Sequence, residues 1–153
     1  MSKLLVAINF FKADVTFIPK QKNILRHWMV DVANIHHCNI DQIDFIFCSD
    51  TYLLNINQQF LAHDTFTDII TFDYSAASKA TSKAISGEIY VSIERVKENA
   101  KIFKTSYVNE LHRVMIHGLL HLCGFKDKKT SDQLQMRRQE DDALKVLEKL
   151  LLI

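Results

Sequence analysis

The sequence is poor in the residues that build disulfide scaffolds and tight turns. Only three of its 153 residues are cysteine, three are glycine and one is proline. The cysteines, Cys38, Cys48 and Cys123, are odd in number and form no C-x-x-C pair. This pattern argues against a disulfide framework and predicts reduced thiols, as in a cytoplasmic protein.

A long apolar segment is also missing. The N-terminal apolar run from Leu4 to Phe11 is too short to span a bilayer. It lacks the small-residue cleavage site of a signal peptide, and the charged residues Lys12 and Asp14 close it. We therefore interpret this run as a buried strand.

Charge of one sign is not in excess. The formal net charge is +1, so no global field attracts nucleic acid, and a nucleic-acid-binding role would need a local basic patch. The simpler interpretation of each candidate residue is a solvated surface charge. The candidates are Lys79 and Lys83 in the central segment, Lys126, Lys128 and Lys129 beside a histidine motif, and Arg137 and Arg138 after it.

What remains is the composition of an ordinary globular protein, with 48% hydrophobic and 24% charged residues. A chain of this size buries about 70% of its surface on folding, which is enough for a conventional hydrophobic core. The sequence contains no internal repeat and no linker that would divide it. We expect residues 1–153 to form one domain.

Hydrophobic periodicity in the first half predicts alternating strands and helices. Strands are expected at 4–9, 41–48, 69–72 and 89–91, and helices at 20–37 and after a cap at Ser49 or Asp50. The segment YSAASKATSKAIS, residues 74–86, has no apolar period. We interpret it as the mobile loop of a hairpin, either a functional lid or an inert surface insertion.

The second half is predicted to be helical. Ser92 is expected to cap a short helix, and Thr105 or Ser106 a longer one that Gly124 ends in a left-handed C-cap. A capping box is expected at the start of the last helix, with buried leucines further along it. The capping residues are Thr130 and Gln133, and the leucines are Leu134, Leu144, Leu147 and Leu151. The whole order predicts an α+β fold with an approximately four-stranded mixed sheet and about five helices.

The segment HGLLHLCGFKD, residues 117–127, carries the strongest chemical signal. His117 and His121 are four residues apart on a predicted helix, which places both imidazoles on one face within reach of one metal ion. Gly124 lets the chain turn back, so that Asp127 can present a carboxylate as a third ligand. Three protein ligands and an open position for water are typical of a catalytic zinc site, where the pKa of the water falls to about 7.

Spacing alone leaves open two core histidines without a metal. The segment also resembles the zinc-protease signature H-E-x-x-H-x-x-G-x-x-H, but Gly118 replaces the glutamate that acts as general base. Glu110 lies two turns earlier on the same helix face, where a surface salt bridge is the simpler interpretation. Cys123 is expected to point to another face, as a small buried residue and not a ligand.

The histidine segment resembles the H-G-x-L-H-L-x-G-Y-D-H motif of the YbeY endoribonucleases, which are ribosomal RNA maturation factors. TDIITF, residues 67–72, resembles the family's T-D-V-L-S-F, and GEIYVS, residues 87–92, resembles its G-D-I-V-I-S. Glu110 and Leu111 match an E-L pair that precedes the motif. The resemblance extends from about residue 40 to 145, and three ordered motifs are far more specific than the histidine pair.

The resemblance implies a cytoplasmic α+β metalloprotein with one zinc ion near the C-terminal end of a helix. It implies metal-dependent cleavage of single-stranded RNA, in the maturation of the 3′ end of 16S ribosomal RNA and in ribosome biogenesis. His117 and His121 match two metal ligands, and Asp127 stands where the family has a third, histidine ligand. These three are therefore the predicted metal-binding and catalytic residues.

Two residues depart from the family pattern. Asp127 offers a harder ligand than imidazole, which relaxes selectivity from zinc towards manganese or magnesium. Leu61, in the segment INQQFL, stands where the family has an arginine suited to binding phosphate, which leucine cannot replace. His63, Lys126 and Arg113 are candidates to supply the missing charge.

Three functions are consistent with these residues. In the first, a ribonuclease, water or the 2′-hydroxyl of the RNA attacks a phosphodiester. The second is a zinc metallopeptidase, which Gly118 disfavours. The third is a non-catalytic ribosome-assembly module with a structural metal, which Leu61 and Asp127 keep open. We expect the ribonuclease, acting on single-stranded or ribosomal RNA and in contact with the small ribosomal subunit.

Overall fold

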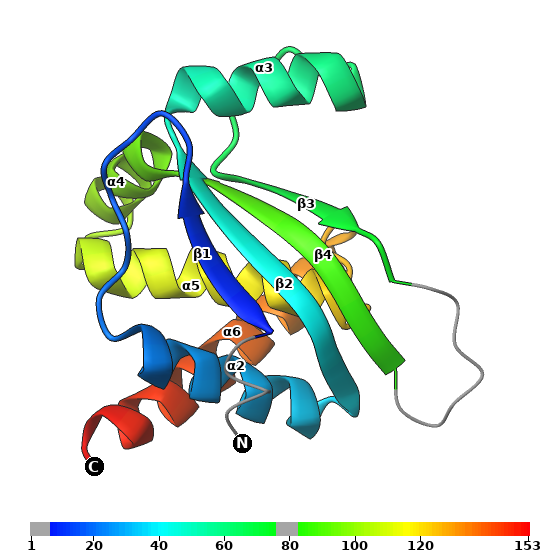
Figure 1. Ribbon diagram of the computed structural model, residues 1–153, viewed down its shortest axis with the longest axis vertical. Helices are drawn as coiled ribbons and strands as arrows, with labels where there is room; N and C mark the ends of the chain where they lie inside the picture. The colour runs from blue at the N-terminus through cyan, green and yellow to red at the C-terminus, as the bar shows by residue number, and fades with distance from the viewer. Residues whose placement is uncertain (1–6, 76–82) are drawn as a thin grey trace.

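The computed structural model describes residues 7–75 and 83–153, which form one sheet with helices packed against it (Figure 1). The elements are β1 (Ile8–Lys12), α2 (Lys22–Ile35), β2 (Cys38–Cys48), α3 (Asp50–Leu61), β3 (Ile69–Asp73), β4 (Lys83–Ser92), α4 (Ile93–Ile102), α5 (Tyr107–Leu122) and α6 (Thr130–Leu151). The four strands and five helices of the described residues confirm the predicted α+β class. None of these helices is long and apolar enough to cross a membrane.

The sheet is mixed, as predicted. Its strand order is β1-β2-β4-β3, in which β1 and β4 each run parallel to β2, and β3 runs antiparallel to β4. The predicted hairpin is confirmed, with Ile69 opposite Val91 and Asp73 opposite Gly87. Among the described strands, β3 is at the edge, so its backbone is free to form the wall of a cleft.

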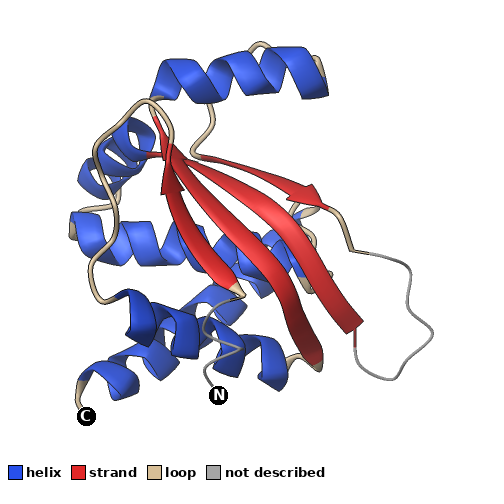
Figure 2. Cartoon of the chain, in the orientation of Figure 1, coloured by secondary structure: helices blue, strands red, loops and turns tan. Residues whose placement is uncertain are grey.

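The alternation of side chains along the strands divides the core between the two faces of the sheet. On one face, α2 and α5 pack against the strands and α6 packs on both helices, in the larger hydrophobic cluster (Figure 2). On the other face, α3 covers one end of the sheet in a smaller cluster of Cys48, Leu53, Ile56 and Ile70. Trp28 ties α2 to α6 by donating a 2.7 Å hydrogen bond from Nε1 to the carbonyl of Ala143.

Three serines cap helices as their positions predicted. The side chains of Ser49, Ser92 and Ser106 accept hydrogen bonds from the backbone N–H groups three residues further on, at the starts of α3, α4 and α5. Each bond satisfies a donor that the first turn of a helix leaves without a partner. The caps therefore stabilise the first turns of α3, α4 and α5.

The C-terminal half of α5 packs unusually closely against β3 and β4. A Cβ atom built on Gly118 would lie 2.9 Å from Cγ2 of Ile89 and 3.0 Å from Cδ1 of Ile69. A Cβ atom on Gly87 of β4 would lie 2.9 Å from Cδ2 of Leu122 in the same helix. The two glycines therefore remove the side chains that would otherwise hold the helix away from the sheet.

Strand boundaries differ from the prediction mainly at their ends. β2 begins at Cys38 and not at 41, because Cys38 is already in register with Lys83 of β4. Residues 83–86, which were predicted as loop, therefore belong to a strand. Residues 76–82 of that loop, and residues 4–6 of the predicted first strand, lie outside the described residues.

Two expectations for the last helix are wrong. Its N-cap is Lys129, which makes no side-chain cap bond, so the Thr130 and Gln133 capping box is not formed. Leu134 and Leu151 are 64% and 41% exposed, whereas Leu144 and Leu147 are buried as predicted. The face that packs on α2 and α5 also carries Met136, Glu140 and Ala143. The leucine spacing did not reveal this face because one of its buried positions is a carboxylate.

We expect Gly118→Ala to lower the free energy of unfolding by about 1–2 kcal/mol, because the cost of overpacking exceeds the gain in helix propensity. Urea unfolding monitored by circular dichroism measures this difference. Ile69→Val removes Cδ1, one of the atoms that would clash with a side chain at position 118. In the double variant, the free energy of unfolding should therefore fall by less than the sum of the decreases in the two single variants. A variant at least as stable as the wild type would show that α5 can move away from the sheet without cost.

His112 makes the stability of the fold depend on pH. Its ring lies edge-on to Trp28, and burial lowers the pKa of His112 to about 4, against about 6.5 for an exposed histidine. The imidazole of His112 binds a proton more readily in the unfolded chain than in the folded protein. The contribution of neutral His112 to the free energy of unfolding is therefore complete above pH 6.5 and is lost as the pH falls towards 4. Between pH 7.5 and 5, we expect the stability difference between wild type and His112→Phe to change by about 2 kcal/mol. A difference independent of pH, measured by urea unfolding, would contradict this assignment.

Candidate active site

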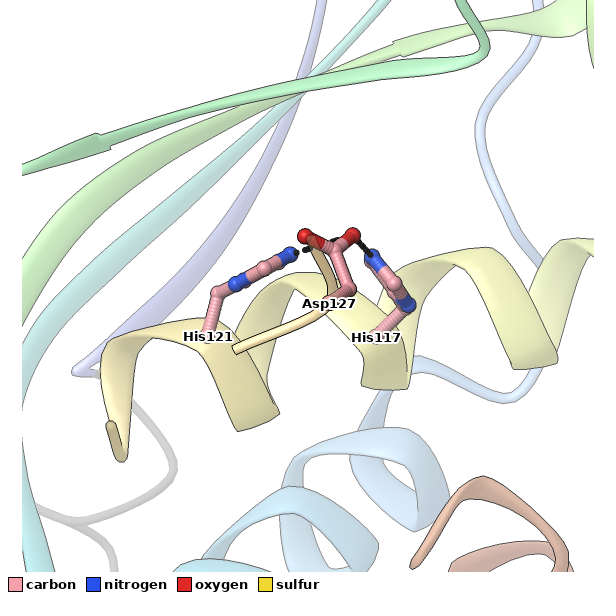
Figure 3. Close-up of side chains that lie close together, drawn as sticks. All are labelled: His117, His121 and Asp127. Carbon is pink, nitrogen blue, oxygen red and sulfur yellow. Dashed lines mark hydrogen bonds and ion pairs between the residues drawn. The ribbon is translucent and has the colours of Figure 1, made fainter. Parts of the chain in front are cut away.

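Three side chains converge at the end of α5. His117 and His121 lie one turn apart on this helix, with ring centroids 4.6 Å from each other. Oδ2 of Asp127 lies 3.2 Å from Nε2 of His117 and 3.1 Å from Nε2 of His121 (Figure 3). The structure therefore brings together all three residues that the sequence predicted as a site.

The turn after α5 carries Asp127 back to the histidines. Gly124, with φ at +108°, donates a backbone hydrogen bond to the carbonyl of His121, and Phe125 donates one to Leu120. These are the two bonds of a Schellman motif, which needs a left-handed residue after the helix. The predicted C-cap at Gly124 is thus confirmed, and it explains how a residue six positions after His121 reaches the same point.

The three donor atoms suit a divalent metal ion. One nitrogen from each histidine and one oxygen from Asp127 all lie within 4.8 Å of one another. Two imidazoles and a carboxylate form a known ligand set for catalytic zinc, which keeps a fourth position open. Cys123 is not part of this group, as the sequence predicted, but it is half-buried and not fully buried as expected.

A buried carboxylate on α6 orients His117. Oε2 of Glu140 lies 2.7 Å from Nδ1 of His117, and its Oε1 accepts a 2.9 Å hydrogen bond from Arg113. Arg113 also donates a 2.7 Å bond to Asp141. A carboxylate on Nδ1 holds the proton there and leaves Nε2 facing a metal. The sequence did not reveal Glu140, because it lies 23 residues after His117 on a helix whose packing face was not predicted.

The electrostatic environment of His117 combines opposing effects. Burial lowers its pKa, but the hydrogen bond and charge of Glu140, with the charges of Asp127 and Asp68, raise the pKa above its ordinary value. A protonated imidazole cannot bind a metal, so the carboxylates that attract the proton would equally attract a cation in its place.

The histidines open into a cleft of about 670 Å³ between α3, the edge strand β3 and the end of α5. Leu61, which replaces the expected arginine, lines this cleft together with His63 and Lys128. Of the residues proposed to supply the missing charge, only His63 reaches the cleft. Arg113 is engaged by Glu140 and Asp141, and Lys126 is not part of the lining.

A second cavity of about 290 Å³ adjoins the first. It shares His117, Asp127, Asp68 and Ile69 with the cleft, and Glu110 lines it. The interpretation of Glu110 as a surface salt bridge is wrong: it is 4% exposed, and no ion pair of the described residues includes it. Burial raises the pKa of Glu110. The face of α5 that carries the histidines is therefore buried at Glu110, two turns closer to the N-terminus of the helix.

Comparison with known proteins agrees with this architecture. The sequence profile of the family described as Endoribonuclease YbeY matches residues 8–148. The protein named Endoribonuclease YbeY from Flavobacterium psychrophilum is 47% identical over 136 residues, which are 89% of this chain and 94% of that protein. Its namesake from Cytophaga hutchinsonii is 45% identical over 137 residues, which are 90% of this chain and 93% of that protein.

A solved structure shares the fold. The solution structure of TM1509 from Thermotoga maritima superposes with a TM-score of 0.60 at 25% sequence identity, covering 92% of this chain and 88% of that one. The profile match and the identity to full-length relatives together place this chain in the YbeY endoribonuclease family.

Proposed function

We propose that this chain is an endoribonuclease that cuts single-stranded RNA with one zinc ion held by His117, His121 and Asp127. The observation that carries the proposal is the convergence of both histidine Nε2 atoms on a single oxygen of Asp127. Bound there, zinc would supply Lewis acidity towards the phosphate and the attacking oxygen. Because a carboxylate is a harder ligand than imidazole, manganese or magnesium are the alternative ions.

The cleft supports RNA as the substrate. Lys128, in the turn after α5, and His63, in the loop after α3, both line the cleft, where they can contact backbone phosphates. The hydroxyls of Thr65, Thr67 and Thr71 add hydrogen-bonding groups to its lining. The relatives carry the name endoribonuclease, and we extend that activity to this chain.

We assign the reaction to ribosomal RNA, in maturation of the 3′ end of 16S ribosomal RNA within ribosome biogenesis. This assignment rests on family membership and on the three ordered motifs of the sequence. A cytoplasmic location accords with the three cysteines, all of which are free thiols. The small ribosomal subunit is then the assembly that presents the substrate.

The two other functions are less well supported. A metallopeptidase of the H-E-x-x-H type needs a glutamate base where this chain has Gly118, packed against the sheet. A structural zinc usually has four protein ligands and a closed site. Among the described residues only three ligands converge, and the His117 and His121 side chains are 21% and 29% exposed. An open position of this kind favours catalysis over a purely structural metal.

Elemental analysis of the purified protein, paired with a cleavage assay on single-stranded RNA, tests the proposal. We expect about one zinc ion per chain, cleavage by the wild type, and loss of both in His117→Ala. His27→Ala, which removes a histidine that does not line the cleft, should retain both. Absence of metal, or equal cleavage by wild type and His117→Ala, would rule the proposal out. A cyclic phosphate at the new end would identify the 2′-hydroxyl as nucleophile.

We expect Glu140→Gln to weaken zinc binding about 10–100-fold, because an amide cannot hold the Nδ1 proton of His117 as a carboxylate does. Competition with a chromogenic zinc chelator measures this change directly, without reference to catalysis. Asp141→Asn is the matched control, since Asp141 contacts Arg113 but not His117. If both variants bind zinc equally tightly, Glu140 does not orient the ligand.

A further inference from the structure

A site that hydrolyses or transesterifies RNA needs a group that takes the proton from the attacking hydroxyl. In the H-E-x-x-H signature this group is the glutamate. Here a side chain at position 118 would meet Ile89 and Ile69, because Gly118 faces the sheet and not the cleft. The proton acceptor must therefore come from another element.

Most of the nearby carboxylates are already engaged or badly placed. Asp127 lies between the two histidines, and Glu140 is bound to His117 and Arg113. Glu110 lines only the second cavity. It is seven residues before His117, which corresponds to about 10 Å along the helix axis.

Apart from Asp127, Asp68 is the one carboxylate of the described residues that lines both cavities together with His117. It immediately precedes Ile69, the residue that contacts α5 at Gly118, and His117 immediately precedes Gly118. The close approach that leaves no room for a side chain at 118 thus brings Asp68 towards the histidines. Its carboxylate lies outside the group of three potential ligands, so it is available for another role.

Contacts with β4 and α4 hold Asp68 in place. Its carbonyl accepts a 2.9 Å hydrogen bond from the backbone N–H of Ser92, the residue that caps α4. Oδ2 accepts a 3.0 Å hydrogen bond from Nδ2 of Asn99 on that helix. Among the described residues, Asn99 is the one side chain that donates a hydrogen bond to this carboxylate, and none donates to Oδ1. One oxygen is thus fixed while the second can accept a proton.

The surroundings of Asp68 favour its protonated form. Burial raises the pKa of its carboxyl, the charge of His117 opposes that effect, and Glu140 adds to it. The net result is a pKa above the ordinary aspartate value, which makes the carboxylate a stronger base.

We propose that Asp68 is the general base of this site, an inference that rests on the ribonuclease function proposed above. Asp68 takes the proton from the attacking hydroxyl, of water or of the ribose, as that oxygen forms its bond to phosphorus. The bond from phosphorus to the leaving oxygen breaks, the leaving oxygen keeps the electron pair, and it takes a proton from solvent. Asp68 then releases its proton to solvent, so that the site returns to its starting state.

The test compares Asp68→Asn with the wild type at saturating zinc. We expect the cleavage rate at neutral pH to fall about 10²–10⁴-fold, the usual range for loss of a general base. Zinc content, measured by elemental analysis, and RNA affinity, measured by fluorescence anisotropy, should stay the same. Asp68→Glu, which keeps a carboxyl one methylene further out, should recover part of the rate.

The pH profile separates a base from a merely structural residue. The wild-type rate should rise with pH as Asp68 loses its proton, and Asp68→Asn should lack this limb. Other titratable and charged groups that face Asp68 also shape both profiles. They are Arg95 on α4, Glu110, Arg113, His117 and His121 on α5, Arg137 and Glu140 on α6, Asp127 and Lys128 in the turn after α5, His63 after α3, and Asp73 at the end of β3. Because loss of the Asp68 charge lowers the pKa of His117, the two profiles are compared at saturating zinc, where the metal and not a proton occupies His117.

Asp31→Asn is the matched control. Asp31 is an exposed carboxylate on α2 that lines neither the cleft nor the second cavity. We expect this variant to cleave at close to the wild-type rate.

Each outcome has a definite meaning. If wild type cleaves RNA and Asp68→Asn cleaves equally fast, the base assignment is overturned while the ribonuclease function stands. Zinc or RNA affinity that falls in proportion to the rate would make Asp68 a positioning residue and would also overturn it. If the wild type itself does not cleave, the proposed function fails first. If Asp68→Asn does not fold, the Asp68→Glu variant provides the test. Partial activity of folded Asp68→Glu would support Asp68 as the general base, whereas folded but fully inactive Asp68→Glu would contradict it.

Discussion

The contact between Gly118 and the isoleucines of β3 and β4 is the constraint on which the site depends. With no side chain at position 118, α5 lies directly against Ile69 and Ile89. This approach places the edge strand beside the helix turn that carries His117 and His121, and so creates the cleft between them. Gly118, which stands where zinc proteases have their glutamate base, is therefore also the residue that allows the cleft to form.

The site depends equally on the packing of α6 against α5. Glu140 is buried at this interface and connects Arg113 and His117, two residues of α5 that lie one turn apart. A carboxylate buried without partners would cost several kcal/mol, whereas here a guanidinium and an imidazole satisfy it. The same contacts thus stabilise the helix pair and fix the orientation of a potential ligand. Changes in the α5–α6 interface will therefore affect both the fold and the site.

Local patterns were sufficient to predict much of this architecture. The alternation in β2, the serine caps of three helices and the spacing of His117, His121 and Gly124 all depend on neighbours within a few residues. Glu140 and Asp68 could not be placed in the site this way, because their roles arise from contacts between elements that are distant in sequence. Leu134 and Leu151 were wrongly predicted to be buried, because the packing of the last helix also depends on contacts between distant elements.

In the last helix, apolar spacing alone could not identify the packing face. That face includes Glu140, which an apolar pattern counts as exposed, and it leaves Leu134 on the outside. Buried polar residues of this kind occur where a site is built, since a functional carboxylate must be desolvated and held. The errors in the predicted core and the residues missed in the predicted site therefore have one cause.

Charge, more than geometry, distinguishes this site from one built on three histidines. With Asp127 as a ligand, a divalent ion and its three protein ligands would together have a net charge of +1, against +2 with a third imidazole, and Leu61 removes a second expected cation. Both changes reduce the attraction for phosphate in the same cleft. Yet Lys128 directly follows Asp127, His63 lies two residues after Leu61, and both line that cleft. Side chains of the adjoining loops can therefore offset part of the positive charge that the two departures remove from the cleft.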